Sequence, residues 1–298
     1  MALVENLVSN LIYGLLLGAI YGISTMGLSI IFGVLRIVNV GHGAFIMIGA
    51  FTVYWLFVLS GIIPPAALFF ALFVGFAIGF LIFYSGIKRL IDAPELATLL
   101  ATFGYGLLIE ELAKYFWGPE FYGYSWDIGA VNIGITLVPY PKLLAALLSA
   151  FLAFSVYAFI KKTKFGMAIR AVVEDKEGAL SCGIDVNRVY AMSFALGIAL
   201  TMMGGVLVAI YTPVGINVYM GGEYTLKAFV IAVLGGLASP IGSFYAGILF
   251  GLFENGSYTL LGLIPGIEPF AMTRFIAFAF LLIILLVRPT GLLRGEEL

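Results

Sequence analysis

The feature that most constrains this chain is a series of apolar runs, each about as long as a membrane is thick. Hydrophobic residues make up 62% of the 298 residues and charged residues only 10%, whereas soluble domains have about 25% charged residues. A helix of about 20 apolar residues spans the hydrocarbon core of a bilayer. The runs are continuous and do not alternate with polar residues, which excludes a transmembrane β-barrel. The sequence therefore predicts an all-α, polytopic membrane protein.

The positions of the runs give the expected crossings. Six spans have clear ends, and they are residues 11–34, 44–60, 66–87, 96–117, 143–160 and 189–211. A shorter run at 225–237 then meets the sequence GGLASPIGS, whose glycines and proline break a helix. A span to about residue 261 and a final span at 271–287 follow. We expect one transmembrane domain over residues 1–298, with about 8–9 spans and a broken or re-entrant segment near 235–243.

Glycines recur every four residues in the first expected span. Gly14, Gly18 and Gly22 therefore lie on one face of a helix. Such a face of small residues lets two membrane helices approach closely. We expect another span to pack against it.

The distribution of lysine and arginine sets the expected orientation, because basic residues gather in cytoplasmic loops. With the charged segment 161–188 in the cytoplasm, eleven basic residues fall inside, and only Lys142 and Lys227 fall outside. The N-terminus is then outside and the C-terminus inside. This arrangement requires an odd number of crossings and favours nine.

The segment 161–188 holds ten of the 31 charged residues (15 basic plus 16 acidic) and cannot lie in hydrocarbon. Four apolar residues lie on one face of a helix: Phe165, Ile169, Val172 and Val173. Three carboxylates lie off that face: Glu174, Asp175 and Glu177. Gly183 is expected to end the helix. Helices that lie on lipid favour basic polar faces, so the acidic face favours an apolar ridge that inserts into a groove on a soluble partner.

Several stretches are similar, in combination, to one family. They are GLSIIFGVLRIVNVGHGAF, KFGMAIRAVVEDKEGALSCGIDVNRV, LKAFVIAVLGGLASPIGSFYAG and the terminal RPTGLL. These stretches resemble the branched-chain amino-acid permease family of ABC importers (LivH type), and the resemblance covers nearly the whole chain. The residues Glu177-Gly178-Ala179, followed by Gly183-Ile184, are similar to the EAA loop that couples such permeases to their ATPases. Gly178 stands where the general motif has alanine.

The resemblance implies a permease subunit that is not itself an enzyme and works by ATP-driven alternating access. The residues implied in ATPase coupling are Arg170, Glu174, Asp175, Glu177, Gly178, Ala179, Gly183 and Ile184. The implied solute is a branched-chain (hydrophobic) amino acid, with urea or short amides as alternatives. The implied partners are a second homologous permease subunit or another copy of this chain, two ABC ATPase subunits and an extracytoplasmic solute-binding protein. The implied location is the inner or plasma membrane of a prokaryote.

Cofactor, metal and catalytic sites are not expected in this chain. It has one cysteine and one histidine and lacks the P-loop, HExxH and GxSxG motifs. ATP and Mg²⁺ would be bound by the partner subunits. The net charge of −1 includes no basic domain, so no nucleic-acid partner is expected.

Two regions are candidates for the translocation path or its gate. The residues concerned are Asn39, His42, Gly235, Gly236, Ser239, Pro240 and Gly242. Irregular backbone at membrane depth is tolerated only where it is buried in protein or faces water. The alternatives are that Asn39 and His42 cap helix ends in a cytoplasmic turn, or that His42 carries protons, and that the segment near Pro240 is a packing turn.

Charged residues inside the expected spans need partners. We expect Glu254 to pair with Arg274, and Glu110 to pair with Lys114 in the favourable i, i+4 order. The pair at Glu110 would lie at the outer surface or form part of a docking surface for a binding protein. The alternative function is an ion- or proton-coupled secondary transporter, a class that shows intramembrane relays and internal repeats. No repeat is visible in this sequence.

Overall fold

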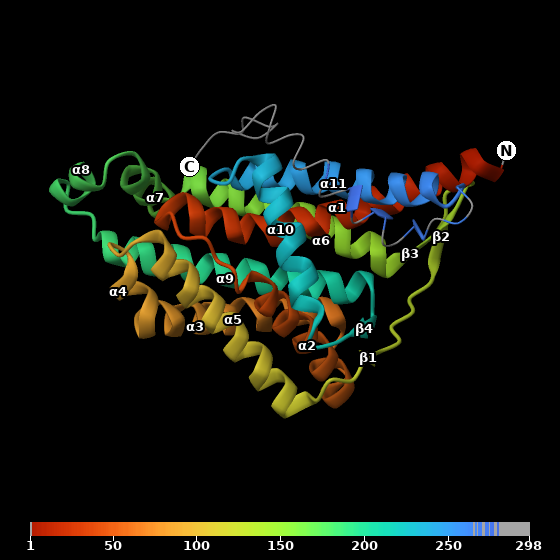
Figure 1. Ribbon diagram of the computed structural model, residues 1–298, viewed down its shortest axis with the longest axis horizontal. Coiled ribbons are helices and arrows are strands. Elements are labelled where there is room, and N and C mark those ends of the chain that lie inside the picture. Colours follow the sequence, from red (N-terminus) through yellow and green to blue (C-terminus); the bar gives the residue numbers. More distant parts are fainter. Residues whose placement is uncertain are drawn as a thin grey trace.

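Long helices dominate the structure, a computed structural model that describes residues 2–264 and positions 266, 268, 269, 272, 273, 275, 276 and 279. Among the described residues, six helices are long and apolar enough to cross a bilayer. Their cores are α1 (Ala2–Leu35), α2 (His42–Ser60), α3 (Ala67–Ile82), α5 (Glu95–Trp117), α6 (Tyr140–Lys162) and α9 (Val186–Tyr211). Figure 1 shows most of them running along the long axis, with the N-terminus at one end.

The third span is longer than α3 itself. The 3-10 turn η1 (Pro64–Ala66) precedes α3, and the π-helical turn η2 (Phe83–Ile87) and α4 (Lys88–Leu90) follow it. Proline occupies the first position of η1, where its missing N–H would have no helical partner. These pieces form one apolar span over residues 64–90.

A sharp break separates α10 (Met220–Gly235) from α11 (Pro240–Leu261), whose axes are bent by 115°. Gly236 has φ +89°, a conformation that favours glycine. Ser239 then caps α11 by accepting a hydrogen bond from the Gly242 N–H at 3.1 Å. The predicted break near 235–243 is confirmed.

The predicted count of about 8–9 spans is not confirmed. The described residues give six long spans, or seven when the bent pair counts as one. The expected final span at 271–287 falls largely outside the described residues. The first helix is also longer than the predicted span 11–34. It continues beyond the apolar run and begins at Ala2.

The fold is mostly helical, as predicted, and four short strands lie between the helices. Strand β1 (Tyr122–Gly123) pairs antiparallel with β4 (Val214–Ile216), and β2 (Ala130–Asn132) pairs antiparallel with β3 (Leu137–Pro139). They lie in loops that were expected to be irregular. The β2–β3 turn is closed by Gly134, whose N–H donates to Asn132 Oδ1 at 2.8 Å. Extended loop backbone has satisfied its polar groups by pairing locally.

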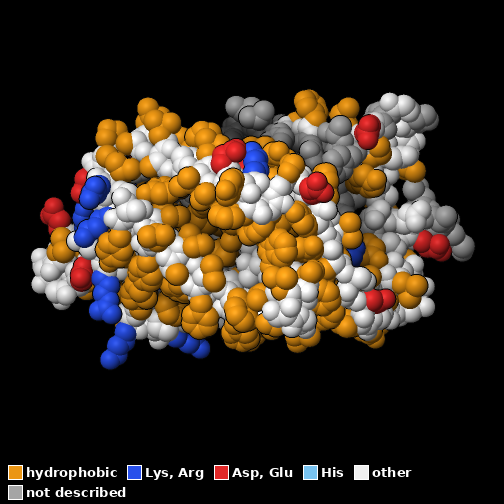
Figure 2. Space-filling view, turned by 90° about the horizontal axis from the view of Figure 1, so that it is seen from below, with side chains coloured by type: hydrophobic (Ala, Val, Ile, Leu, Met, Phe, Trp, Pro, Cys, Tyr) orange, Lys and Arg blue, Asp and Glu red, His pale blue; other side chains and the backbone are white. Residues whose placement is uncertain are grey.

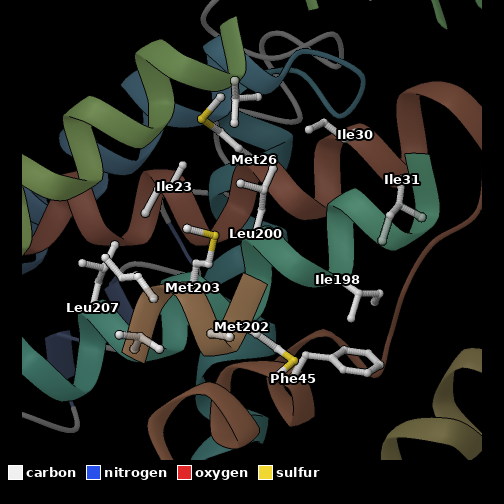
Figure 3. Packing of buried hydrophobic residues seen from close by; sticks show 14 of the residues in the cluster. Ile23, Met26, Ile30, Ile31, Phe45, Ile198, Leu200, Met202, Met203 and Leu207 are labelled. Carbon is white, nitrogen blue, oxygen red and sulfur yellow. The ribbon is translucent and has the colours of Figure 1, made fainter. Parts of the chain in front are cut away.

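Helix α9 lies at the centre of the core. Nearly every residue from Val189 to Tyr211 is buried, and the helix packs against α1, α2 and α3. Figure 3 shows side chains from α1, α2 and α9 in contact there. The labelled residues are Ile23, Met26, Ile30 and Ile31 of α1, Phe45 of α2, and Ile198, Leu200, Met202, Met203 and Leu207 of α9.

The glycine face of α1 packs against α11, as its spacing predicts. A Cβ atom added at Gly14 would lie 2.6 Å from the carbonyl oxygen of Gly251. One added at Gly18 would lie 2.7 Å from that of Gly247. Because the backbones touch, no side chain larger than hydrogen fits between the two helices.

The surface separates into an apolar band and a charged end. In Figure 2 hydrophobic side chains cover the middle of the visible face, while most of the visible lysines and arginines gather at one end. In Figure 1 that end carries α4, α7 (Lys164–Glu174) and α8 (Lys176–Ser181). Polar residues lie where a bilayer would end.

Candidate functional site

The charged segment forms two capped helices, α7 and α8, where the sequence predicted one. Thr163 caps α7 by accepting from the Gly166 N–H at 3.0 Å. Asp175 interrupts the helix with extended dihedral angles (φ −149°, ψ 103°). Its carboxylate then caps α8 by accepting from the Glu177 N–H at 3.0 Å. The favourable aspartate cap explains the break, which periodicity alone could not indicate.

The end of α8 confirms the predicted role of Gly183. This residue has φ +81°, and its N–H donates to the Leu180 carbonyl at 2.9 Å. The Ile184 N–H donates to the Ala179 carbonyl at 3.0 Å. These two bonds form a Schellman motif, which requires a left-handed residue at the Gly183 position.

The apolar face of this segment is buried against the chain itself, which corrects the predicted ridge. Ile169 is 0% exposed, and Val172 and Ala179 are each 4% exposed. The core they join includes residues of α6 and α9. A face that fills the chain's own core cannot also insert into a partner.

An acidic surface remains available on the segment. Glu174, Asp175 and Glu177 are exposed, and the side chains of Met167 and Leu180 are each 52% exposed. The structure therefore keeps the predicted carboxylates on the surface, with two isolated apolar side chains nearby.

Arg170 is directed inwards. Its guanidinium donates to the Ile160 carbonyl near the end of α6, and Gly166 lies against the same carbonyl. Lys176 Nζ, on α8, lies 3.4 Å from Oδ1 of Asp92, which follows α4 in the chain. These contacts hold α7 and α8 to neighbouring spans, while the predicted coupling roles stay predictions.

The link between α1 and α2 turns back into the fold. Ile31 of α1 lies beside Gly197 of α9, and α1 continues past that contact for one more turn to its end at Leu35. His42, which begins α2, nevertheless lies back beside Thr201, with 3.3 Å between His42 Nδ1 and Thr201 Oγ1. Residues 36–41 are therefore a non-helical segment that runs back along α9. The sequence had predicted only a simple turn here.

Neither predicted cap at this link is present. Helix α2 has Gly41 at its N-cap and no side-chain cap. The Thr201 hydroxyl donates to the Gly197 carbonyl at 2.8 Å, and His42 Nδ1 lies 3.3 Å from the same hydroxyl oxygen. His42 Nε2 and Asn39 Nδ2 are buried with no hydrogen-bond partner among the described residues.

The two candidate path regions lie at opposite ends of α10. At one end, the Gly43 N–H donates to Thr225 Oγ1 at 2.8 Å, next to His42. At the other end, the backbones of Gly235 and Gly242 are in direct contact. Helix α10 has 16 residues, so its ends are about 24 Å apart. The structure does not bring the predicted path residues into one cluster.

A buried ion-pair cluster connects α10 to α11. Lys227 Nζ lies 2.8 Å from Glu254 Oε1 and 3.0 Å from Glu223 Oε1, and the Lys227 side chain is only 13% exposed. It also donates to the Tyr21 hydroxyl at 2.9 Å. The ammonium group therefore lies at the hydroxyl edge of the Tyr21 ring, 4.9 Å from the ring centroid.

This cluster bears on two predictions. Lys227, which was counted among the basic residues on the outer side, has only 13% of its side chain exposed, within the bent helix pair. Glu254 pairs with Lys227, whereas its predicted partner Arg274 lies outside the described residues. The i, i+4 spacing of Glu223 and Lys227 was a signal that could have indicated part of the cluster.

Two cavities flank the cluster. One of about 280 Å³ lies between the end of α9, β4 and the start of α10, and includes Glu223 and Tyr224 in its wall. The other, of about 270 Å³, is lined by Tyr21, Lys227 and Glu254. Both are many times larger than the roughly 10–15 Å³ that a single water needs. Among the described residues, no group of His, Cys, Asp and Glu is arranged to hold a metal ion.

The predicted pair at the end of α5 is confirmed. Lys114 Nζ lies 3.2 Å from Glu110 Oε1 and 2.7 Å from Glu111 Oε1. Unlike Lys227, this lysine has its carboxylate partners on one helix. Its ammonium group also lies 4.9 Å from the centroid of the Tyr219 ring, at the start of α10.

The chain is similar in sequence to permease proteins of branched-chain amino acid transport systems. The permease protein LivH of the high-affinity branched-chain amino acid transport system of Salmonella typhimurium is 26% identical, over 95% of this chain and 94% of its own length. LivH of Escherichia coli K12 is 27% identical with the same coverage. BraD of Pseudomonas aeruginosa, a permease of the same kind of system, is 26% identical over 99% of this chain and 98% of its own.

One solved structure, of PsaBC from Streptococcus pneumoniae in complex with Fab, covers 93% of this chain and 91% of its own at 16% identity, with a TM-score of 0.49, and we infer nothing from it. The family described as branched-chain amino acid transport system / permease component matches residues 10–285, which is most of the chain. The chain therefore belongs to the branched-chain amino acid transport system permease family.

Proposed function

We propose that this chain is the permease subunit of an ABC importer that carries branched-chain amino acids across the membrane by ATP-driven alternating access. Membership of the permease family supports this proposal, and so do the names of the relatives LivH and BraD. The permease would act with a second homologous permease or another copy of itself, two ATPase subunits and an extracytoplasmic solute-binding protein. ATP and Mg²⁺ would be bound by the ATPase subunits.

The observation that carries the mechanism is the geometry of α7 and α8. Their apolar face is anchored in the core, and Glu174, Asp175 and Glu177 project from the end of the molecule. A rigid, exposed acidic surface is suited to contact a separate soluble subunit. Because it is anchored to α6 and α9, movement of that subunit would be passed to the spans.

The orientation follows from the same end of the molecule. Lysines and arginines gather around α4 and α7 (Figure 2), and basic residues favour the cytoplasmic side. We therefore place α7 and α8 in the cytoplasm and the N-terminus, at the opposite end in Figure 1, outside.

Uptake measurements test the function. The permease is expressed in cells that lack leucine uptake, together with the ATPases, second permease and binding protein of a branched-chain amino acid importer. We expect uptake of labelled leucine that requires active ATPase subunits and survives a protonophore while ATP is maintained. Uptake that needs no ATPase and collapses with the proton gradient would instead establish a secondary transporter. Competition by urea and acetamide tests the alternative substrates.

Substitutions in α8 test the coupling surface. Glu177→Lys reverses an exposed charge, and Gly183→Leu is incompatible with φ +81°. Both should leave the permease in the membrane but reduce ATPase co-purification and uptake. Glu120→Lys, a charge reversal on an exposed loop beyond the other end of α5, is the matched control. Normal transport with bound ATPase in Glu177→Lys would show that this surface is not the coupling element.

A further inference from the structure

The 280 Å³ cavity combines an aliphatic wall with a carboxylate. Its lining includes Val208 at the end of α9, Ile216 of β4 and Met220 of α10. Val208 and Ile216 are each 2% exposed, so this wall is fixed by the core. Glu223, one turn further along α10, also lines the cavity, with its side chain 37% exposed.

The Glu223 carboxylate is held in place by the ion-pair cluster. Lys227, one turn along the same helix, contacts Glu223 at 3.0 Å and Glu254 at 2.8 Å. Lys227 is thus shared between Glu223 and Glu254. A carboxylate has about four acceptor positions, so Glu223 can also accept from a primary ammonium group.

The start of α10 supplies the opposite polarity. Tyr219 occupies its N-cap without a side-chain hydrogen bond to the helix, and at Gly222 an added Cβ would meet nothing within 4 Å. The first N–H groups of a helix carry partial positive charge and are suited to a carboxylate. Discontinuous membrane helices in transporters use their N-termini for substrate carboxylates in this way.

We propose that this cavity binds an aliphatic amino acid as its zwitterion, with the ammonium group on Glu223 and the side chain against Val208, Ile216 and Met220. The carboxylate would face the first turn of α10. The cavity lies away from α7 and α8 along α9 (Figure 1), so it would receive solute on the outer side. This inference rests on the proposed function, and it names the site at which that solute first contacts the permease.

Protection from thiol labelling tests the site directly. Val214, on the rim of the cavity, is 72% exposed, so Val214→Cys alters no core contact. Cys182, the single cysteine, is first replaced by serine. The complex in nanodiscs is treated with a water-soluble maleimide, with and without leucine. We expect leucine to slow labelling of Val214→Cys at least five-fold. Tyr115→Cys, 83% exposed on α5, should label at the same rate with leucine as without it.

Analogues separate ligand recognition from a purely structural role of Glu223. The compound 4-methylpentanoate has the leucine skeleton without the ammonium group. In Glu223→Gln we expect the leucine concentration for half-protection to rise ten-fold or more, because a charge-assisted hydrogen bond is lost. The weaker protection by 4-methylpentanoate should stay unchanged. Asp92→Asn removes a carboxylate that also pairs with a lysine, Lys176, but at the opposite end of the molecule, and should leave leucine protection unchanged.

Each outcome bears on the site separately from the function. The site is refuted if leucine does not protect Val214→Cys, or if Glu223→Gln weakens protection by leucine and by 4-methylpentanoate equally. If leucine does not protect but cells take it up with ATP, the proposed function stands without the site. If alanine or another zwitterion protects in a Glu223-dependent way while leucine is not transported, the site stands and the proposed solute is wrong.

Discussion

Removing Lys227 should destabilise this protein more than removing either of its partners. Lys227→Met leaves two carboxylates, Glu223 and Glu254, close together with only part of their surface in contact with water. Breaking a buried ion pair from one side costs about 3–5 kcal/mol. Because Glu223 is partly exposed, we expect the lower end, about 3 kcal/mol.

Glu254→Gln should be milder. The amide oxygen can still accept from Lys227, which keeps its contacts with Glu223 and Tyr21. The change replaces an ion pair with a hydrogen bond from the ammonium to a neutral amide, a loss of about 1 kcal/mol. The double variant has one buried carboxylate fewer than Lys227→Met. It should therefore lose about 2 kcal/mol of unfolding free energy, whereas adding the losses of the two single variants gives about 4 kcal/mol.

The measurement is reversible unfolding of the purified chain in mixed micelles of mild detergent and SDS, followed by circular dichroism. Lys114→Met is the matched control, because Lys114 also contacts two carboxylates but on the exposed side of α5; it should change the unfolding free energy little. The pairing is refuted if the double variant loses as much unfolding free energy as the two single variants together, to within about 0.5 kcal/mol. The same cycle with Arg274→Leu tests the pair that the sequence suggested.

Two further predictions concern glycines. Gly18→Leu should destabilise the protein by at least about 1–3 kcal/mol, because its Cβ would lie 2.7 Å from the Gly247 oxygen. The control Gly104→Leu should not destabilise it, because an added Cβ there meets nothing within 4 Å. Equal losses of unfolding free energy in the two variants would contradict the α1–α11 contact. Gly178→Ala should lower protection from hydrogen exchange in α8, because its Cβ would collide with the Asp175 carboxylate that caps the helix; raised protection would show that helix propensity outweighs the cap.

The spans and the helix break could be predicted because they depend on local composition. Apolar runs long enough to cross a bilayer identify themselves by length, and Pro240 with its neighbouring glycines marks the break without knowledge of what packs against it. Gly183 was predictable for the same reason, since a Schellman motif is built from residues close in sequence.

The partners of buried groups could not be predicted in the same way. Glu254 had two basic residues within reach in sequence, and only the bend between α10 and α11 decides that Lys227 contacts it. The apolar face of α7 was correctly identified, but periodicity does not say which surface covers Ile169. The backward course of residues 36–41 depends on contacts with α5 and α9. One such contact is the 3.2 Å hydrogen bond from the Val40 N–H to Thr102 Oγ1.

Helix α9 gives the proposed coupling a physical route. It is capped by Asp185, two residues after Gly183 of the Schellman motif, and runs from Val186 to Tyr211, within the stretch that lines the cavity holding Glu223. Its 26 residues make about 39 Å of helix. Because nearly all of it is buried, it can shift or tilt as a unit but cannot bend freely. A displacement of α8 by an ATPase would therefore reach Val208 directly, and it would change the distance between that aliphatic wall and α10. Binding and release of the solute would then depend on the position of a single helix.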